Sequence, residues 1–502
     1  MVSLTRRQLI GTVIAGTVLA AGAGVGIPTF ISATSSRDPW RHLREGLRGR
    51  LFTPDDARYW PLTSSSNGRY LPVRPQAVAA VADAEDAAAC IRWCRENNVP
   101  FAVRGGGHSF AGFSTSTGLV ISTANLTTQS LDARSGRLIA GAGLTNADLA
   151  KLQSAGGAGK WLLPGGSCLS VGIGGLVLGG GVGPNSSWAG LTADRLRETT
   201  VVTAAGDIVT ASATENADLF WAARGAGGGN FGLHTDFTFD TVPVATSVAT
   251  SGVFSVVGRQ NAVSAAMAWQ DLVAQHPNLV SGSYRIEATK GNTVAGSARL
   301  QVLVGESDAR ALLAPVFEFA SVVDVAERRW WDAYNWYNYA SPPRASNWYR
   351  SHYVYDPLTE DALDQQADYL ERFDIQGGER SAHLALQGYV GGEVNAVGRT
   401  ATAYVHRGAR MIVRQLVSWP SAAAWLSEAP PIPRDLEAWG TESWSALSQH
   451  TSDESYQNFP DPAQRDWPSA YYAENLPRLS AIKRSYDPDN VFSFAQAVPL
   501  SV

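Results

Sequence analysis

Cysteine is scarce in this sequence: its 502 residues include three, at positions 90, 94 and 168. Three thiols are too few for a disulfide framework, and the absence of a CxxC pair argues against a zinc site. Cys90 and Cys94 stand four residues apart in a helical stretch, so we expect them to be small buried side chains.

An excess of positive charge is also missing. The net charge is −5, which excludes the basic footprint of a nucleic-acid-binding protein. Beyond the N-terminal segment no apolar run reaches the length of a membrane span, and there is no internal repeat. The composition, 45% hydrophobic and 17% charged, is that of a globular protein with two or three domains.

The N-terminus differs from the rest of the chain. Arg6 and Arg7 precede a Gly/Ala-rich, moderately apolar stretch with small residues near Ala33, which predicts a twin-arginine signal peptide over residues 1–35. A membrane anchor is the alternative, but the glycines, Pro28 and the weak hydrophobicity favour the signal. We therefore expect export to the periplasm, the cell envelope or the exterior, with no stable membrane span after processing.

The pattern of elements predicts an α+β protein. A helix over 77–97 leads into a strand at 99–105, and RETTVVTAAGDIVTAS predicts a hairpin. From about residue 246 the segments predict an antiparallel sheet backed by helices at 261–275 and 307–320, with later strands in AHLALQGYVGG, TATAYVHRG and RMIVRQLVSW. From residue 450 the chain is loop-rich and then helical near 469–485.

Glycine is abundant, and three of its clusters lie within one domain. They are RGGGHS at 104–109, PGGSCLSVGIGGLVLGGGVG at 164–183 and RGAGGGNFG at 224–232. No GK[ST] follows any of them, and the GxGG string lacks the preceding strand and the acidic residue of a dinucleotide fingerprint. Each cluster alone could be a tight turn, but three together suit a long ligand lying extended against bare backbone.

These clusters, with ENADLFWAARGAGGGNFG and the closing YDPDNVF, closely resemble the berberine-bridge-enzyme-like flavoproteins of the vanillyl-alcohol-oxidase superfamily. The resemblance extends from about residue 58 to 499. It implies a two-lobed PCMH-type FAD-binding domain over 36–245 and a substrate-binding domain over 246–449. It also implies that segment 450–502 returns to the FAD domain.

The resemblance further implies two covalent bonds to one FAD. His108 corresponds to the histidine bonded to the flavin 8α-methyl group, and Cys168, 60 residues later, to the cysteine bonded to flavin C6. Imidazole and thiolate are suitable nucleophiles for an electron-poor ring. The other FAD contacts that it implies are Arg104, Gly105, Gly106, Gly107, Ser109, Gly112, Gly166, Ser167, Val171, Gly172, Gly175, Gly229, Asn230, Gly232, Asn490 and Phe492.

On the substrate side, relatives use a tyrosine of a YxNY motif as the base, and here YQNF places Tyr456 there. Arg414 and Gln415 stand on a strand where relatives have an acid or amide, and which of the two faces inward is open. Tyr353 and Tyr355 could also reach the site. Ala189 and Thr115 replace tyrosines of the plant alcohol oxidases, so that site is not preserved.

Val171, three residues after the cysteine, is smaller than the Ile or Leu of oxygen-shy relatives and favours an oxidase. The predicted function is an exported oxidase that takes hydride from a hydroxyl of a carbohydrate, glycosylated molecule or secondary alcohol, with O₂ as acceptor and H₂O₂ as product. A dehydrogenase with another acceptor, or a secreted flavin-bearing binding protein with little turnover, are the alternatives. The predicted partners are a small-molecule or oligosaccharide substrate and O₂, and no metal is implied.

Overall fold

The computed structural model describes residues 38–156, 159–338, 345–421 and 428–501. The chain divides into Met1–Ser36 and Arg37–Val502, and the second unit is described here. The signal peptide predicted at 1–35 lies outside the described residues. Within the described part of the chain, no helix has both the length and the apolar character needed to cross a membrane.

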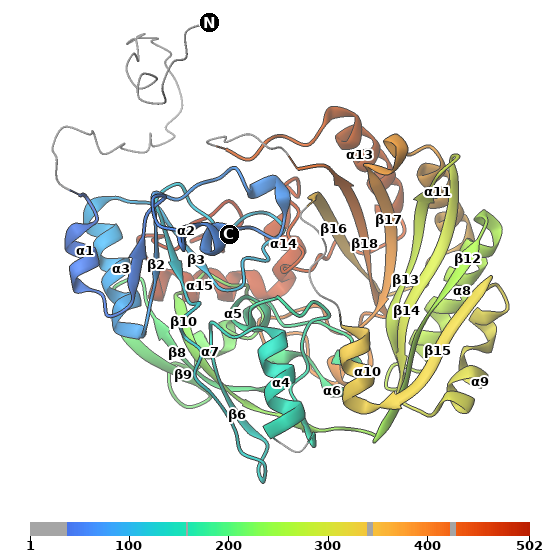
Figure 1. Cartoon of the computed structure of the whole chain (residues 1–502), viewed down its shortest axis with the longest axis horizontal. Helices are drawn as coiled ribbons and strands as arrows, with labels where there is room; N and C mark the ends of the chain where they lie inside the picture. Colours follow the sequence, from blue (N-terminus) through green and yellow to red (C-terminus); the bar gives the residue numbers. More distant parts are fainter. Residues whose placement is uncertain (1–37, 157–158, 339–344, 422–427, 502) are drawn as a thin grey trace, which may run out of the picture. The chain divides into compact units, whose positions relative to one another are not determined.

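Two sheets form the part of the fold that carries the glycine loops (Figure 1). In the first, β2, β4 and β3 run parallel and β1 pairs antiparallel with β2. The second is an antiparallel sheet in the order β5-β6-β10-β8-β9. The strands are β1 (Arg50–Phe52), β2 (Ala77–Ala80), β3 (Phe101–Arg104), β4 (Leu119–Ser122), β5 (Gln129–Leu131), β6 (Arg137–Gly141), β8 (Leu196–Val202), β9 (Ile208–Ser212) and β10 (Leu233–Asp240). A short pair joins β7 (Trp161–Leu162) to β11 (Val242–Pro243).

The structure corrects the helix predicted over 77–97. Residues 77–80 form the buried strand β2, and the helix α3 (Ala84–Asn97) begins only after it. The side chain of Asp83 caps α3 by accepting a bond from the backbone N–H of Asp86, and Asn98 ends it in the left-handed region. The alanine-rich stretch is strand because it pairs with neighbours on both sides. The hairpin predicted in RETTVVTAAGDIVTAS is confirmed as β8 and β9.

The third sheet has seven antiparallel strands in the order β15-β12-β14-β13-β17-β18-β16. They are β12 (Val248–Val257), β13 (Val280–Thr289), β14 (Thr293–Val302), β15 (Val322–Arg329), β16 (Ser346–Val354), β17 (Ser381–Gly388) and β18 (Met411–Trp419). Figure 1 shows α8 (Arg259–Gln275), α9 (Glu306–Phe317) and α11 (Glu360–Glu371) along one face, and α13 (Arg434–Ser448) packs there too. The predicted antiparallel sheet backed by helices is therefore present.

Alternation along the strands separates the two faces of this sheet. Tyr284, Leu300 and Val413 point into the apolar core beneath the helices. Their neighbours on the opposite face are polar: Ser283 on β13, Gln301 on β14 and Arg414 on β18. The sheet thus presents a polar face away from its helices, which is where a polar ligand can be held.

The strand predicted in TATAYVHRG is absent, because residues 401–408 form a buried loop between α12 (Gly392–Asn395) and β18. Its backbone donors go elsewhere: the N–H of Ala403 bonds to Trp221 and that of Tyr404 to Arg224. Arg407 forms a buried ion pair with Asp194 at 2.7 Å. These hydrogen bonds to the third glycine loop and to the helix before it take the place of the backbone hydrogen bonds that a strand would make to a neighbouring strand.

The C-terminal segment is tied to the third glycine loop by Lys483 of α15 (Leu476–Tyr486). Its Nζ donates to the carbonyls of Asn230 and Phe492 and to Asp487, each at 2.7 Å, and the side chain is fully buried. Asp487 of the closing motif also accepts bonds from the backbone N–H groups of Val491 and Phe492. The remaining helices are α1 (Arg41–Gly46), α2 (Tyr59–Thr63), α4 (Asn146–Gly156), α5 (Ile173–Leu178), α6 (Ser186–Ala189), α7 (Ala217–Ala222), α10 (Trp330–Tyr337) and α14 (Trp467–Tyr472).

Candidate active site

A cavity of about 1150 Å³ connects the three glycine loops with the polar face of the seven-stranded sheet and with residues 456–460. Sites for drug-sized ligands commonly measure roughly 300–1,000 Å³, so this cavity has room for a large cofactor and a second molecule. All three glycine clusters singled out in the sequence line it.

Some of the glycines are required by packing between loops. A Cβ on Gly106 would lie 2.4 Å from the backbone nitrogen of Gly172, and a Cβ on Gly172 would lie 2.3 Å from that of Gly106. The first two loops therefore touch backbone to backbone, which no larger residue allows. At these two positions glycine is needed because the backbones of the two loops lie in contact.

Other glycines leave open space in the cavity. A Cβ on Gly105, Gly228 or Gly229 would meet no protein atom closer than 3.7 Å, and one on Gly175 would meet nothing within 4 Å. All four line the cavity, and together they come from all three loops. Bare backbone around a long cavity fits a flat, extended cofactor such as FAD, whose ring and phosphates need close approach.

A matched pair of substitutions separates these two roles. Gly106→Ala is expected to destabilise the fold by about 1–3 kcal/mol through the clash with Gly172. Gly175→Ala clashes with nothing and replaces glycine inside the helix α5, so it should keep or raise the melting temperature while reducing the FAD content. Thermal unfolding and the flavin-to-protein absorbance ratio measure both effects. Full FAD loading in Gly175→Ala would show that the space beside Gly175 is not used by the cofactor.

The side chains of His108 and Cys168 both lie next to the hydroxyl of Ser170. The Oγ of Ser170 lies 2.9 Å from Nε2 of His108 and 3.4 Å from Sγ of Cys168, and all three residues line the cavity. Burial, with the nearby Arg104 guanidinium, lowers the pKa of His108 to about 4, so its imidazole is neutral at pH 7. A neutral imidazole keeps the lone pair that a nucleophile needs.

The structure gathers nearly all the predicted FAD contacts around this cavity. Asn490 is the exception: it adopts a left-handed conformation (φ 52°) in the exposed turn after Asp487 and does not line the cavity. Phe492, two residues later, does line it and packs edge-on against Phe101. The candidates that line the cavity are Arg104, Gly105, Gly106, Gly107, His108, Ser109, Gly112, Gly166, Ser167, Cys168, Val171, Gly172, Gly175, Gly229, Asn230, Gly232 and Phe492.

Tyr456 lies at the cavity with its hydroxyl surrounded by donors. The oxygen accepts bonds from the backbone N–H groups of Gly181 (3.2 Å) and Val182 (3.1 Å) and from the amide of Asn458 (3.2 Å). Burial raises the pKa of Tyr456, and the three donors oppose that rise. Gly181, at φ +80°, provides the backbone turn of the LGGGVG stretch, a role that the sequence does not reveal.

The structure resolves which residue of β18 faces inward. Arg414 lines the cavity, whereas Gln415 shares the opposite face with Val413 and donates a bond to Ser443 of α13 at 3.0 Å. Gln415, a candidate for the reaction site, therefore lies under the helices. One position of offset along a strand reverses the direction of a side chain.

Tyr353, also a candidate, does not line the cavity. Its ring is fully buried and its hydroxyl bonds to that of Tyr404 at 2.6 Å. Residues 452–454 cover it, because the backbone of Tyr353 exchanges bonds with Glu454 and Ser452. Tyr353 supports the segment that carries Tyr456 and has no direct access to a ligand.

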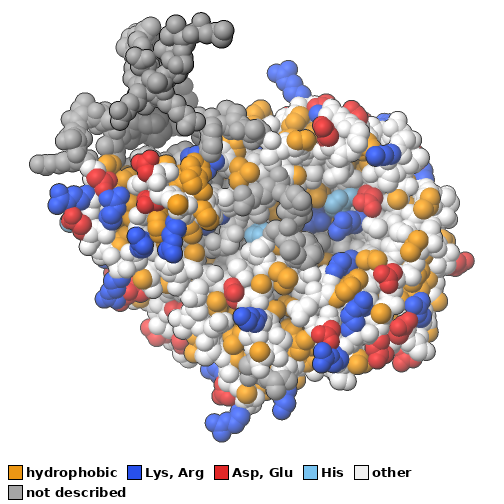
Figure 2. All heavy atoms as spheres, in the orientation of Figure 1, with side chains coloured by type: hydrophobic (Ala, Val, Ile, Leu, Met, Phe, Trp, Pro, Cys, Tyr) orange, Lys and Arg blue, Asp and Glu red, His pale blue; other side chains and the backbone are white. Residues whose placement is uncertain are grey.

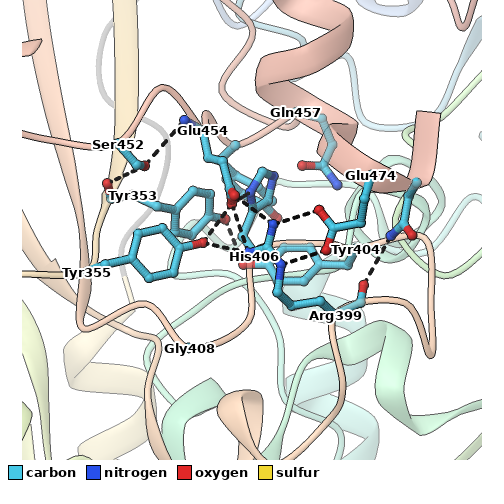
Figure 3. A network of polar contacts seen from close by, with 12 residues as sticks. Tyr353, Tyr355, Arg399, Tyr404, His406, Gly408, Ser452, Glu454, Gln457 and Glu474 are labelled. Atoms are coloured by element: carbon cyan, nitrogen blue, oxygen red, sulfur yellow. Dashed lines mark hydrogen bonds and ion pairs between the residues drawn. The ribbon is translucent and has the colours of Figure 1, made fainter.

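Figure 3 shows that Tyr353 belongs to a network of polar groups that includes His406 and Glu454. His406 stacks on Tyr353 with ring centroids 4.2 Å apart and bonds to Glu454 at 2.8 Å. Glu454 also binds Arg399 and the hydroxyl of Tyr355. Burial alone would raise the pKa of Glu454, but the bonds from His406, Arg399 and Tyr355 outweigh it and lower that pKa to about 2. The charged carboxylate therefore fixes the start of the segment two residues before Tyr456.

The sequence interpretation missed an aromatic wall of the cavity, formed by Phe110, which directly follows the first glycine loop, with Tyr349 and Phe459. Phe110 stacks on Tyr349 with ring centroids 3.7 Å apart, and Phe459 contacts both Phe110 (5.6 Å) and Tyr456 (5.0 Å). All four rings line the cavity. Strand alternation could have found Tyr349, because it lies on the same face of β16 as Tyr353.

The cavity and the outer surface differ in charge. Figure 2 shows basic and acidic side chains interspersed over one face of the molecule. Among the described residues that line the cavity there is no Asp, Glu or Lys, and the arginines are Arg104 and Arg414. Burial lowers the pKa of His108 to about 4 and that of His234 to about 3, so both are neutral. The cavity is thus positive and contains no carboxylate base.

The fold and this cavity define a protein that binds a long, flat, anionic cofactor beside a second ligand. Comparisons with known proteins also indicate a cofactor-binding protein, and they name FAD as the cofactor. Residues 75–212 match a family model described as an FAD binding domain, and residues 455–499 match one described as berberine and berberine like. The chain is 30% identical over 467 residues to the uncharacterized FAD-linked oxidoreductase YgaK of Bacillus subtilis, covering 90% of this chain and 97% of that protein.

Other relatives extend over similar lengths. Glucooligosaccharide oxidase of Sarocladium strictum is 29% identical over 88% of this chain and 90% of its own. Among solved structures, Physcomitrella patens BBE-like 1 superposes with a TM-score of 0.80 at 23% identity, covering 93% of this chain and 100% of that chain. Xylooligosaccharide oxidase from Myceliophthora thermophila C1 superposes with a TM-score of 0.78 at 25% identity, covering 91% and 98%. The chain belongs to the berberine-bridge-enzyme-like family of FAD-linked oxidoreductases, with the α+β, PCMH-type fold of that family.

Proposed function

We propose that this protein is an exported carbohydrate oxidase that removes hydride from a sugar hydroxyl, uses a bicovalently bound FAD and passes the electrons to O₂ to give H₂O₂. Residues 36–245 and 450–502 would hold the FAD, and 246–449 the sugar. The oligosaccharide oxidases among the relatives, each similar over most of the chain, support the substrate class.

One observation carries the proposal: the hydroxyl of Tyr456 sits among three N–H donors at a cavity without carboxylates. Oxidation of an alcohol needs a base for the hydroxyl proton as hydride leaves the carbon. With no Asp or Glu among the described residues that line the cavity, and with burial lowering the pKa values of His108 and His234 so that both are weak bases, Tyr456 is the strongest candidate. Its three donors stabilise the negative oxygen of a deprotonated tyrosine, as an oxyanion site does.

The first two glycine loops would hold the cofactor. The imidazole of His108 and the thiol of Cys168 would each bond to one ring, and their shared neighbour Ser170 supports this assignment. When bound, FAD supplies the hydride acceptor and the route of the electrons to O₂. Val171 lines the cavity beside this pair and is the small residue that we propose admits O₂.

The aromatic wall would hold the donor. Phe110, Tyr349 and Phe459 offer flat apolar surfaces of the kind on which sugar rings stack, and Gln387 adds a polar group from the sheet. Tyr456 adjoins this wall through Phe459, so a sugar stacked there has its hydroxyl near the proposed base.

A panel of mono- and oligosaccharides with peroxide detection tests the proposal. Cellobiose, xylobiose, lactose and their monosaccharides are mixed with the purified holoenzyme in air, and the Tyr456→Phe variant is the matched control. At least one sugar should give peroxide with the wild type and little with the variant. A sugar that bleaches the flavin and needs an artificial acceptor for turnover would make the protein a dehydrogenase. If no sugar bleaches the flavin, it is not a carbohydrate oxidase.

A further inference from the structure

The substrate side of the cavity contains a guanidinium without a carboxylate partner. Arg414 projects from β18 beside the aromatic wall, 5.5 Å from the ring centre of Tyr349 and 5.6 Å from that of Phe459. Its one polar contact among the described residues is at 3.5 Å, between Nη2 and Nε2 of His383. Its Nε is buried and bonds to no group of the described chain.

Two buried arginines of this protein are neutralised by carboxylates. Arg350 pairs with Asp461 at 3.1 Å, and Arg407 pairs with Asp194 at 2.7 Å, with all four side chains less than 10% exposed. Burying a charge without a partner costs several kcal/mol, so a partly buried cation facing a cavity points to a partner that arrives with the ligand.

No carboxylate among the described residues that line the cavity supplies that negative charge. The described residues that line the cavity include no Asp or Glu, and the stretches outside the described part of the chain contain neither residue. His383 cannot compensate, since burial and then the charges of Arg414 and Arg285 lower its pKa well below the usual value. In the proposed arrangement the glycine loops would hold the FAD phosphates, whereas Arg414 projects from β18 of the seven-stranded sheet.

We propose that Arg414 recognises an anionic group on the donor, so that the substrate is an acidic carbohydrate bearing a carboxylate or a phosphate ester. The inference rests on the proposed function and names the substrate class of the same site. A guanidinium matches the two oxygens of either group with parallel N–H donors. The side-chain oxygen of Gln387 is buried at the cavity and bonds to no group of the described chain, so it can accept a bond from a sugar hydroxyl.

Equilibrium binding tests the inference independently of oxidation at the anomeric carbon. Methyl α-D-galactopyranosiduronate and neutral methyl α-D-galactopyranoside differ in the group at C6, and neither has a free anomeric hydroxyl. Titration of the holoenzyme, followed by the flavin difference spectrum, should show the acid binding on the order of 10- to 100-fold more tightly. Arg414→Gln should remove that difference, and Arg414→Lys should keep part of it.

Arg285→Gln is the matched control. Arg285 lies on the same face of the sheet and in the same row as Arg414, with Ala385 between them, but it does not line the cavity. This variant removes the same charge near His383 and should leave the preference for the acid intact. Equal binding of both glycosides by the wild type, or an equal loss of preference in Arg285→Gln, would overturn the inference.

Turnover assays distinguish this inference from the proposed function. Galacturonate and galactose 6-phosphate are compared with galactose, and the preferred acid identifies the anionic group. Arg414→Gln should raise KM for the acid much more than KM for galactose, with little change in kcat for either. If the variant slows acidic and neutral sugars alike, Arg414 acts on the flavin and the inference fails, although the oxidase proposal stands. If no sugar bleaches the flavin, the oxidase proposal fails, and the glycoside titration still decides the role of Arg414.

Discussion

Replacing Tyr456 with phenylalanine is expected to slow reduction of the flavin by a sugar donor by roughly 10²–10⁴-fold, the usual contribution of a general base. The variant keeps the ring that packs against Phe459 and loses only the oxygen. FAD content should be unchanged, because none of the proposed bonds to the cofactor involves this hydroxyl. Anaerobic stopped-flow spectroscopy at the flavin absorbance band measures the rate.

The pH dependence provides a second measurement on the same variant. Burial raises the pKa of Tyr456 above its usual value near ~10, and the base must be deprotonated to act. The reduction rate of the wild type should therefore rise with pH through the alkaline range, and Tyr456→Phe should lose that rise. Tyr472→Phe is the control, because Tyr472 also lines the cavity but its hydroxyl donates only to the carbonyl of Ala226. An equal loss of rate in Tyr472→Phe would contradict the role of Tyr456.

Removing both His108 and Cys168 is expected to release the flavin from denatured protein. Each single variant, His108→Ala or Cys168→Ala, should still precipitate yellow from acid, because one covalent bond remains. The double variant should leave a colourless pellet and a yellow supernatant. Absorbance of the two fractions, with the intact mass of each protein, measures the number of bonds.

Cys94→Ala is the matched thiol control. Cys94 is buried in α3, and burial raises the pKa of its thiol to about 12, so it is unreactive. This variant should precipitate yellow like the wild type. A colourless wild-type pellet would contradict covalent attachment, and a colourless pellet from Cys168→Ala alone would show that the bond to His108 does not form.

Much of this architecture was predictable because it rests on local chemistry. The glycine clusters, the β8–β9 hairpin and the helices α8 and α9 follow from turn residues and periodicity. Residues 77–80 were misassigned because alanine favours helix locally, whereas pairing on both sides makes this stretch a buried strand. The loop at 401–408 reads as a strand in isolation, and its bonds to the third glycine loop are visible only in three dimensions.

The two sides of the site also differ in how much of them the sequence could predict. The FAD side depends on motifs within the loops, so nearly all the FAD contacts predicted from the sequence line the cavity. The substrate side depends on which face of a strand points inward and on what covers it. The sequence therefore could not decide between Arg414 and Gln415, or detect that residues 452–454 cover Tyr353. That no carboxylate is found among the described residues lining the cavity also emerges only when distant segments come together.

Double-mixing stopped-flow spectroscopy with the best sugar donor tests the central claim, that this flavoenzyme is a sugar oxidase. Anaerobic mixing with the donor should bleach the flavin. Subsequent mixing with O₂ should restore its colour at least as fast as steady-state turnover, with one H₂O₂ formed for each sugar oxidised. A flavin that the sugar reduces but that stays bleached in air-saturated buffer, or one that no sugar bleaches, would contradict the account.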